Sequence, residues 1–147
     1  LTVVGSVVGS PPYMSPEQAA GREDVDARSD IYSVGGVAYF LLTGLQPFQR
    51  ETAMEMMLAH ADEAPRPLSE LRPDVPRDLE EIVLRCLRKK PGERYADADS
   101  LEKALARCAD AGAWTEEDAA AWWQEARFGP DTQEATPAPT LRQPATA

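Results

Sequence analysis

The fold of this chain is decided by the stretch Gly9-Ser10-Pro11-Pro12-Tyr13-Met14-Ser15-Pro16-Glu17-Gln18. Its prolines fix φ at about −65° and push each preceding residue toward an extended conformation, so its first half predicts a rigid loop. Its second half is typical of a helix start, with Ser15 as the cap, Pro16 in the first position and Glu17 in the first turn. By itself, this pattern fits any ordinary junction between a loop and a helix.

Three further motifs follow this stretch in the 147-residue chain. They are Asp26-Ala27-Arg28-Ser29-Asp30-Ile31-Tyr32-Ser33-Val34-Gly35, Leu41-Leu42-Thr43-Gly44-Leu45-Gln46-Pro47-Phe48 and Lys90-Pro91-Gly92-Glu93-Arg94-Tyr95. In order and spacing, the four motifs resemble the C-terminal lobe of the eukaryotic-like (Hanks-type) serine/threonine protein kinases of bacteria. The resemblance implies a mainly α fold, namely the helical C-terminal lobe of the protein-kinase fold, truncated before the activation segment and without the small lobe.

Composition and turn residues divide the chain into three parts. We predict a partial protein kinase domain over residues 1–108, comprising the end of the activation segment and the helical lobe. A C-terminal extension helix is expected within residues 109–129, because Thr115 begins a capping-box pattern and Gly129-Pro130 ends the helix. Residues 130–147 are rich in Pro, Thr and Ala and have little to bury, so we expect a disordered tail.

A central helix is predicted over residues 31–42. These residues are apolar almost all round apart from small side chains, which is typical of a helix buried in the middle of a domain. Asp30 lies at its beginning, where a carboxylate suits the unpaired N–H groups of a helix start. We expect Gly44 to end it.

Three more helices are predicted downstream. A capping box of Thr52 and Glu55 opens a helix over residues 52–61, and we expect its apolar stripe to face the core. The members of that stripe are Met54, Met57, Leu58 and Ala61. The two later helices carry the stripes Leu79, Ile82, Val83, Cys86 and Leu87, and Leu101, Ala104, Leu105 and Cys108.

The balance of charge argues against one large class of partner. With 15 Lys and Arg against 25 Asp and Glu, the net charge is −10, which does not suit nucleic-acid binding. No apolar run approaches the roughly 18 residues that a transmembrane helix needs, and no secretory leader is recognised. We therefore expect no membrane segment in this fragment and a cytoplasmic location, while an anchor elsewhere in a longer parent stays open.

The cysteine and histidine residues indicate structure rather than chemistry. Cys86 and Cys108 lie on predicted apolar stripes, so we expect buried thiols instead of a disulfide or a metal site, as a reducing cytoplasm permits. His60 is the only histidine, which excludes a multi-histidine metal centre. We assign His60 no chemistry.

The resemblance implies a substrate-binding role for the opening loop. Ser10 matches the hydroxyl residue that orients the catalytic loop beside the phosphoacceptor in serine/threonine kinases, where tyrosine kinases typically carry proline. The pocket for the substrate residue that follows the acceptor is implied for Pro11, Pro12, Tyr13 and Met14.

Structural roles are implied for three charged residues. Glu17 matches a glutamate that forms a buried ion pair in the family, and Arg94 matches its arginine partner. The alternative is two exposed charges worth less than about 1 kcal/mol. Asp30 matches an aspartate that hydrogen-bonds the backbone of the catalytic loop, a segment that we do not find here.

Thr2 and Ser6 fall where the family carries activation-loop phosphorylation, which can order a segment by pairing with arginine. That arginine precedes the catalytic aspartate in the family. Because this segment is missing, we expect Thr2 and Ser6 to be plain loop hydroxyls in the fragment, although they remain its candidate phosphorylation sites.

Phosphoryl transfer in this family requires a Gly-rich loop, a strand lysine with its glutamate, a catalytic aspartate and asparagine, and the Asp-Phe-Gly metal ligand. None of these motifs is found, and residues 5–9 lack the glycine spacing of a phosphate loop. We therefore predict no catalytic, cofactor-binding or metal-binding residues in the fragment, and no catalysis by it alone. ATP and Mg²⁺ are implied for the intact parent.

Two hypotheses for function remain. The chain is part of a serine/threonine protein kinase whose intact form phosphorylates protein substrates, or it is a non-catalytic, kinase-like docking module. Leu1 favours the first hypothesis, because an open reading frame normally begins with Met.

Overall fold

The computed structural model describes residues 10–128, and it divides the chain into two units, Leu1–Ala111 and Gly112–Ala147. Thr2 and Ser6, and the tail predicted over residues 130–147, lie outside the described residues.

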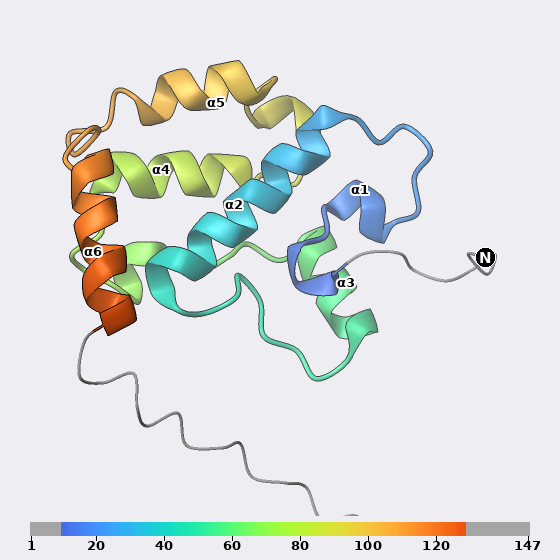
Figure 1. Cartoon of the computed structure of the whole chain (residues 1–147). Coiled ribbons are helices and arrows are strands. Elements are labelled where there is room, and N and C mark those ends of the chain that lie inside the picture. The colour runs from blue at the N-terminus through green and yellow to red at the C-terminus, as the bar shows by residue number, and fades with distance from the viewer. Residues whose placement is uncertain (1–9, 129–147) are drawn as a thin grey trace, which may run out of the picture. The chain divides into compact units, whose positions relative to one another are not determined.

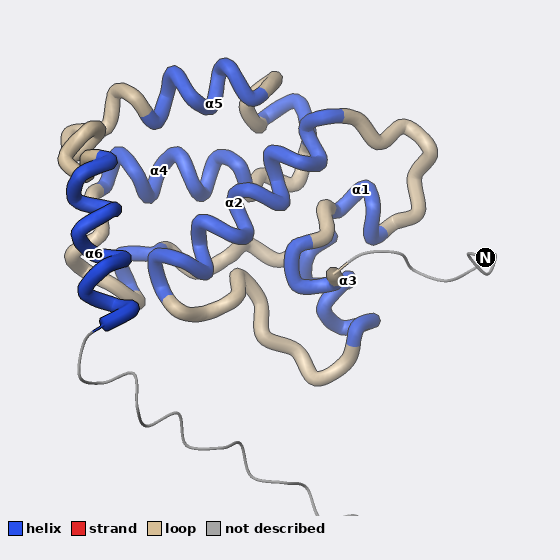
Figure 2. Tube along the Cα trace, in the orientation of Figure 1, coloured by secondary structure: helices blue, strands red, loops and turns tan. Residues whose placement is uncertain are grey.

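The described part of the first unit is built from helices and short 3₁₀ turns (Figures 1 and 2). The helices are α1 (Pro16–Ala19), α2 (Ala27–Thr43), α3 (Ala53–Asp62), α4 (Arg77–Cys86) and α5 (Ala98–Leu105), and the 3₁₀ turns are η1 (Pro11–Tyr13), η2 (Leu68–Glu70) and η3 (Pro91–Glu93). No strand occurs within residues 10–128. The predicted mainly α fold class is confirmed.

Helix α2 runs through the middle of this unit and packs against α4, and α5 lies along the far side of α4 (Figure 1). The main core forms between α2 and α4 and is closed by the connection before α4. Its buried members are Tyr32, Tyr39, Leu68, Val75, Val83 and Leu87. Gly35 permits the close approach, because a Cβ there would lie 2.6 Å from the Cβ of Cys86.

The start of α2 differs from the prediction. The helix begins four residues early, at Ala27, because the Asp26 carboxylate accepts a hydrogen bond from the Arg28 N–H at 2.9 Å and caps it. Asp30 therefore lies in the first turn, where it is exposed. The predicted end is confirmed, since Gly44 adopts the left-handed conformation with φ of 73°.

Helix α3 begins as predicted, with reciprocal hydrogen bonds between Thr52 and Glu55. The predicted core face is wrong for two of its four members, since only Met57 and Ala61 are half-buried. Met54 and Leu58 are 64% and 58% exposed, whereas the buried side chains are those of Met56, Ala59 and His60. The buried face of α3 is therefore the one that carries His60, its only buried polar residue.

A second core lies between α4, α5 and the start of α2. Its buried members are Ile31, Ile82, Cys86, Tyr95 and Leu101. Helix α5 ends at Leu105, earlier than predicted, and Leu105 itself is exposed. Both cysteines are free; Cys86 is buried as predicted and Cys108 is half-buried. Burial raises the pKa of the Cys86 thiol to about 11.

The described part of the second unit contains α6 (Glu116–Phe128). The predicted capping pattern is present, because the Asp118 N–H donates to the Thr115 hydroxyl and the Asp118 carboxylate accepts from the Thr115 N–H. The rings of Trp122 and Trp123 pack edge to face with centroids 4.8 Å apart. Among residues 10–128, none of the helices has the length and apolarity needed to span a bilayer.

Candidate functional site

The loop predicted to contact substrate is a closed 3₁₀ turn, in which the Ser10 carbonyl accepts a hydrogen bond from the Tyr13 N–H at 2.9 Å. Ser10 is exposed, and Pro11, Pro12 and Tyr13 are half-buried. Met14 is only 5% exposed and is therefore buried. The structure therefore leaves four of the five predicted contact residues on the surface.

Two consecutive carbonyls fix the loop to the rest of the unit. The Pro12 carbonyl accepts from Nε2 of His60 at 3.0 Å, and the Tyr13 carbonyl accepts from the Ser33 hydroxyl at 2.8 Å. Gly36 makes room for this contact, because a Cβ there would lie 3.2 Å from a ring carbon of Tyr13. Helices α2 and α3 thus position the loop from two sides.

The structure brings Glu17 and Arg94 together in a bidentate ion pair, with N–O distances of 2.6 and 2.8 Å. The Arg94 side chain has no exposed surface and that of Glu17 is 4% exposed. The guanidinium also donates to three main-chain carbonyls, those of Arg28, Arg88 and Lys89, so all five of its N–H groups have an acceptor.

Glu17 is also held by Ser29, whose hydroxyl donates to the carboxylate at 2.5 Å. Burial by itself would raise the pKa of Glu17, but the hydrogen bonds from Arg94 and Ser29 outweigh it and lower the pKa to about 2. The pair joins α1, the start of α2 and the segment before η3. The role of the pair is structural, because both side chains are shielded from solvent.

His60 contacts the substrate-facing loop, which sequence reasoning missed. Its ring is fully buried, and it accepts or donates at both nitrogens, with Nδ1 at 2.8 Å from the Tyr32 hydroxyl and Nε2 facing Pro12. It also packs edge to face against Phe48, with ring centroids 4.9 Å apart. Burial first, and then the nearby Lys89 cation, lower the pKa of His60 to about 4, so the ring is neutral near pH 7.

Lys89 completes this cluster at the C-terminal end of α3. Its ammonium group donates to the main-chain carbonyl of His60 at 2.8 Å and lies 4.6 Å from the centroid of the Phe48 ring. Cations are favoured at helix C-termini, where carbonyls lack partners. Burial lowers the pKa of Lys89 to about 8.

The two clusters meet at Tyr32. The Arg94 guanidinium lies 4.9 Å from the centroid of the Tyr32 ring, whose hydroxyl bonds to His60. A continuous set of contacts therefore runs from Glu17 to the Pro12 carbonyl. Met56, Ala59 and His60 have helical spacing, so they could have indicated the buried face of α3. A hydropathy pattern does not detect this face, because one of its three members is a polar histidine.

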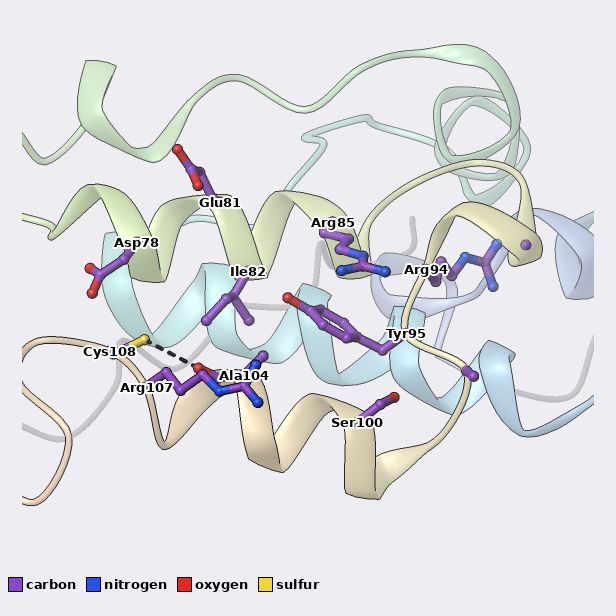
Figure 3. A pocket seen from close by; sticks show the side chains of 12 residues that line it. Asp78, Glu81, Ile82, Arg85, Arg94, Tyr95, Ser100, Ala104, Arg107 and Cys108 are labelled. Carbon is purple, nitrogen blue, oxygen red and sulfur yellow. Dashed lines mark hydrogen bonds between the residues drawn. The ribbon is translucent and has the colours of Figure 1, made fainter.

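A separate open groove of about 770 Å³ lies between α4 and α5 (Figure 3). Asp78 and Glu81 line it on α4, and Arg85 stacks over Tyr95 with the guanidinium carbon 4.2 Å from the ring centroid. None of the predicted substrate-contacting residues lines this groove.

Acidic, histidine and cysteine side chains are dispersed over the described residues. Within residues 10–128, no three His, Cys, Asp or Glu side chains are grouped so that they could hold a metal ion. Asp30 is exposed on α2.

Comparison with known proteins identifies the family of the chain. A family model described as "Protein kinase domain" matches residues 2–106. The chain belongs to the protein kinase family. Its helices, without any strand in the described residues, correspond to the helical C-terminal lobe of the kinase fold and not to the β-rich small lobe.

The chain is similar to bacterial members of the family. It is 45% identical over 104 residues to serine/threonine-protein kinase Pkn1 of Myxococcus xanthus, covering 71% of this chain and 15% of that protein. It is 42% identical over 107 residues to serine/threonine-protein kinase PknB of Mycolicibacterium smegmatis, covering 73% of this chain and 17% of that protein. The chain thus spans about a sixth of the length of these curated relatives.

A further relative is named for a different acceptor amino acid. Tyrosine-protein kinase MasK of Myxococcus xanthus is 42% identical to the chain over 104 residues, covering 71% of this chain and 16% of that protein. Its identity equals that of PknB. Overall similarity therefore does not decide which hydroxyl amino acid is the acceptor.

Proposed function

We propose that this chain supplies the substrate-facing part of a serine/threonine protein kinase domain, whose longer parent transfers the γ-phosphate of ATP to protein hydroxyls. The observation that carries the proposal is the loop of residues 10–13. It presents an exposed Ser10 hydroxyl on a turn whose next carbonyls are held by Ser33 and His60. Surface residues on a rigid scaffold are suited to recognition.

An exposed apolar stripe on α2 supports a larger domain. Val34, Val37 and Leu41 are 50%, 45% and 74% exposed, and their spacing places them on one face of the helix. A central helix with an apolar outer face indicates a surface that further protein covers. We propose that preceding residues of the longer kinase cover it.

The acceptor class is proposed from Ser10, because the resemblance associates a hydroxyl at this position with serine and threonine acceptors. Protein substrates are proposed for the same reason. Because MasK is named a tyrosine-protein kinase, tyrosine is the alternative acceptor that a measurement must exclude.

A docking module is the second candidate function. It is favoured by Met54 and Leu58, which leave an apolar patch on α3 at the surface. Such a patch would bind a partner protein without any transfer of phosphate.

Transfer of labelled phosphate to matched Ser, Thr and Tyr peptides separates these candidates. The protein extended by its upstream coding sequence is expected to label Ser and Thr peptides, and the 147-residue chain is expected to label none. Ser10→Ala in the extended protein should lower labelling, while Ser69→Ala, which removes a hydroxyl on η2, should not. Labelling confined to the Tyr peptide would contradict the acceptor class, and an extended protein that folds but transfers nothing would favour the docking module.

A further inference from the structure

We propose that His60 is a positioning residue for the substrate-facing loop, acting through a directed hydrogen-bond chain that ends on the Pro12 carbonyl. The consequence for substrate binding rests on the proposed function, because it assumes that this loop contacts the peptide substrate. The positioning itself rests only on contacts within the first unit.

The direction of the chain follows from which groups can donate. The Pro12 carbonyl can only accept, so the proton of the neutral His60 ring lies on Nε2. Nδ1 is then an acceptor, and the Tyr32 hydroxyl donates to it at 2.8 Å. The geometry thus selects one tautomer.

Lys89 reinforces the same direction. Its ammonium group can only donate, and it lies 3.4 Å from the Tyr32 hydroxyl oxygen. By occupying a lone pair of that oxygen, it leaves the hydroxyl proton for His60. Lys89 also donates to the His60 main-chain carbonyl at 2.8 Å. It therefore holds the main chain of His60 directly and the ring through Tyr32.

The loop depends on its carbonyls because its sequence removes other means of attachment. Pro11 and Pro12 have no N–H groups, so this part of the turn cannot donate to its surroundings. The side-chain bonds to its main chain are those from Ser33 and His60. His60 has no exposed surface, and the contact with Phe48 restricts its ring. The position of the ring therefore determines where the Pro12 carbonyl lies.

This role differs from that of the Glu17–Arg94 pair. The charged pair ties together segments far apart in the chain, and its loss would affect the whole unit. The bond from His60 ends on a single carbonyl of a surface turn. Its loss is expected to loosen that turn selectively.

Amide hydrogen exchange in the 147-residue chain tests the selectivity. His60→Leu replaces the ring with an apolar side chain that still fills buried space but cannot donate, and it should speed exchange of the Tyr13 and Met14 amides at least tenfold relative to those of α4. His60→Gln can donate from its amide nitrogen near the position of Nε2, so it should keep these rates within about threefold of the parent.

Tyr39→Phe is the matched control, because it removes another buried hydroxyl that donates to a main-chain carbonyl, that of Arg66. It should leave exchange of the loop amides unchanged. Equal acceleration of the loop and α4 amides in His60→Leu would overturn the proposal, as would unchanged loop exchange.

A measurement on the unmodified chain keeps the proposal testable if the leucine variant does not fold. Nitrogen NMR of the histidine ring should show the Nε2–H tautomer at pH 7, with slow exchange of that proton. The Nδ1–H tautomer cannot donate to Pro12, so finding it would overturn the proposal.

Peptide kinetics with the extended kinase test the consequence for substrate. His60→Leu should raise KM for the peptide about tenfold, with KM for ATP unchanged, and His60→Gln should restore most of the loss. An unchanged peptide KM would overturn the substrate role. If the extended protein has no kinase activity, the proposed function fails, while the exchange and NMR results still decide whether His60 positions the loop.

Discussion

The first unit contains two buried polar networks of opposite character. The Glu17–Arg94 network is charged, and every guanidinium N–H finds an acceptor among segments that are distant in the chain. The Tyr32–His60 network is neutral at its centre and ends on one carbonyl of a surface turn. The comparison indicates that the charged network determines whether the unit is stable, whereas the neutral network determines where the loop lies.

The largest expected effect comes from breaking the charged network. Arg94→Ala leaves the Glu17 carboxylate buried without its partner, so the free energy of unfolding should fall by about 3–5 kcal/mol. Urea denaturation of the 147-residue chain measures this loss. Arg66→Ala, which removes an exposed i,i+4 ion pair, is the control and should cost less than about 1 kcal/mol. Similar losses in the two variants would contradict the architectural role of the pair.

The second prediction concerns acid. His60 has a pKa near 4 in the folded chain against an ordinary value of 6.5, so the unfolded state binds more protons between these values. The stability that the neutral His60 ring contributes should therefore be fully present above pH 6.5. This contribution should fall by about 3 kcal/mol as the pH drops to 4. Glu17 adds a second loss between pH 4.5 and 2, because its folded pKa is about 2.

His60→Gln separates the two windows, because glutamine does not titrate. Its stability should stay level between pH 6.5 and 4 apart from the contributions of other groups, while the loss below pH 4.5 remains. Thermal melts at closely spaced pH values measure both. A variant whose melting temperature falls between pH 6.5 and 4 as steeply as the parent's would show that His60 is not the group responsible.

A smaller and more local effect is expected from Gly36→Ala. The new Cβ would lie 3.2 Å from the Tyr13 ring, so the ring must shift, at a cost of about 1 kcal/mol. Amide shifts in an NMR spectrum should change at residues 10–14 and remain unchanged in α4 and α5. Gly92→Ala is the control, because its Cβ would meet no atom within 4 Å. Changes spread evenly over the unit would contradict a locally held loop.

The sequence predicts those parts of this fold that depend on neighbours in the chain. The capping box of Thr52 and Glu55 and the helix end at Gly44 involve residues within one turn, so their patterns are sufficient. The predicted start of α2 was wrong, because Asp26 and Asp30 both suit a helix start. Only the structure shows that Asp26 is the residue that caps the helix.

The candidate site depends on contacts that local patterns do not contain. Glu17 and Arg94 are separated by 77 positions, and only the resemblance to a family paired them beforehand. His60 was overlooked because a hydropathy stripe chose the opposite face of α3, whereas the packing follows the hydrogen bonds to Tyr32 and Pro12. A polar residue can thus define a buried face when its partners lie in other segments.

The smallest effect on stability is expected outside both networks, at Leu41 on the exposed stripe of α2. Leu41→Lys places a cation in the last turn of the helix, where the dipole favours it, so the stability of the 147-residue chain should change by less than about 0.5 kcal/mol. Sedimentation should show less self-association, because the stripe loses its most exposed apolar member. In the extended kinase, the same change buries a charge under preceding residues and should lower the yield of folded protein. A variant that folds equally well in both contexts would contradict the proposal that those residues cover α2.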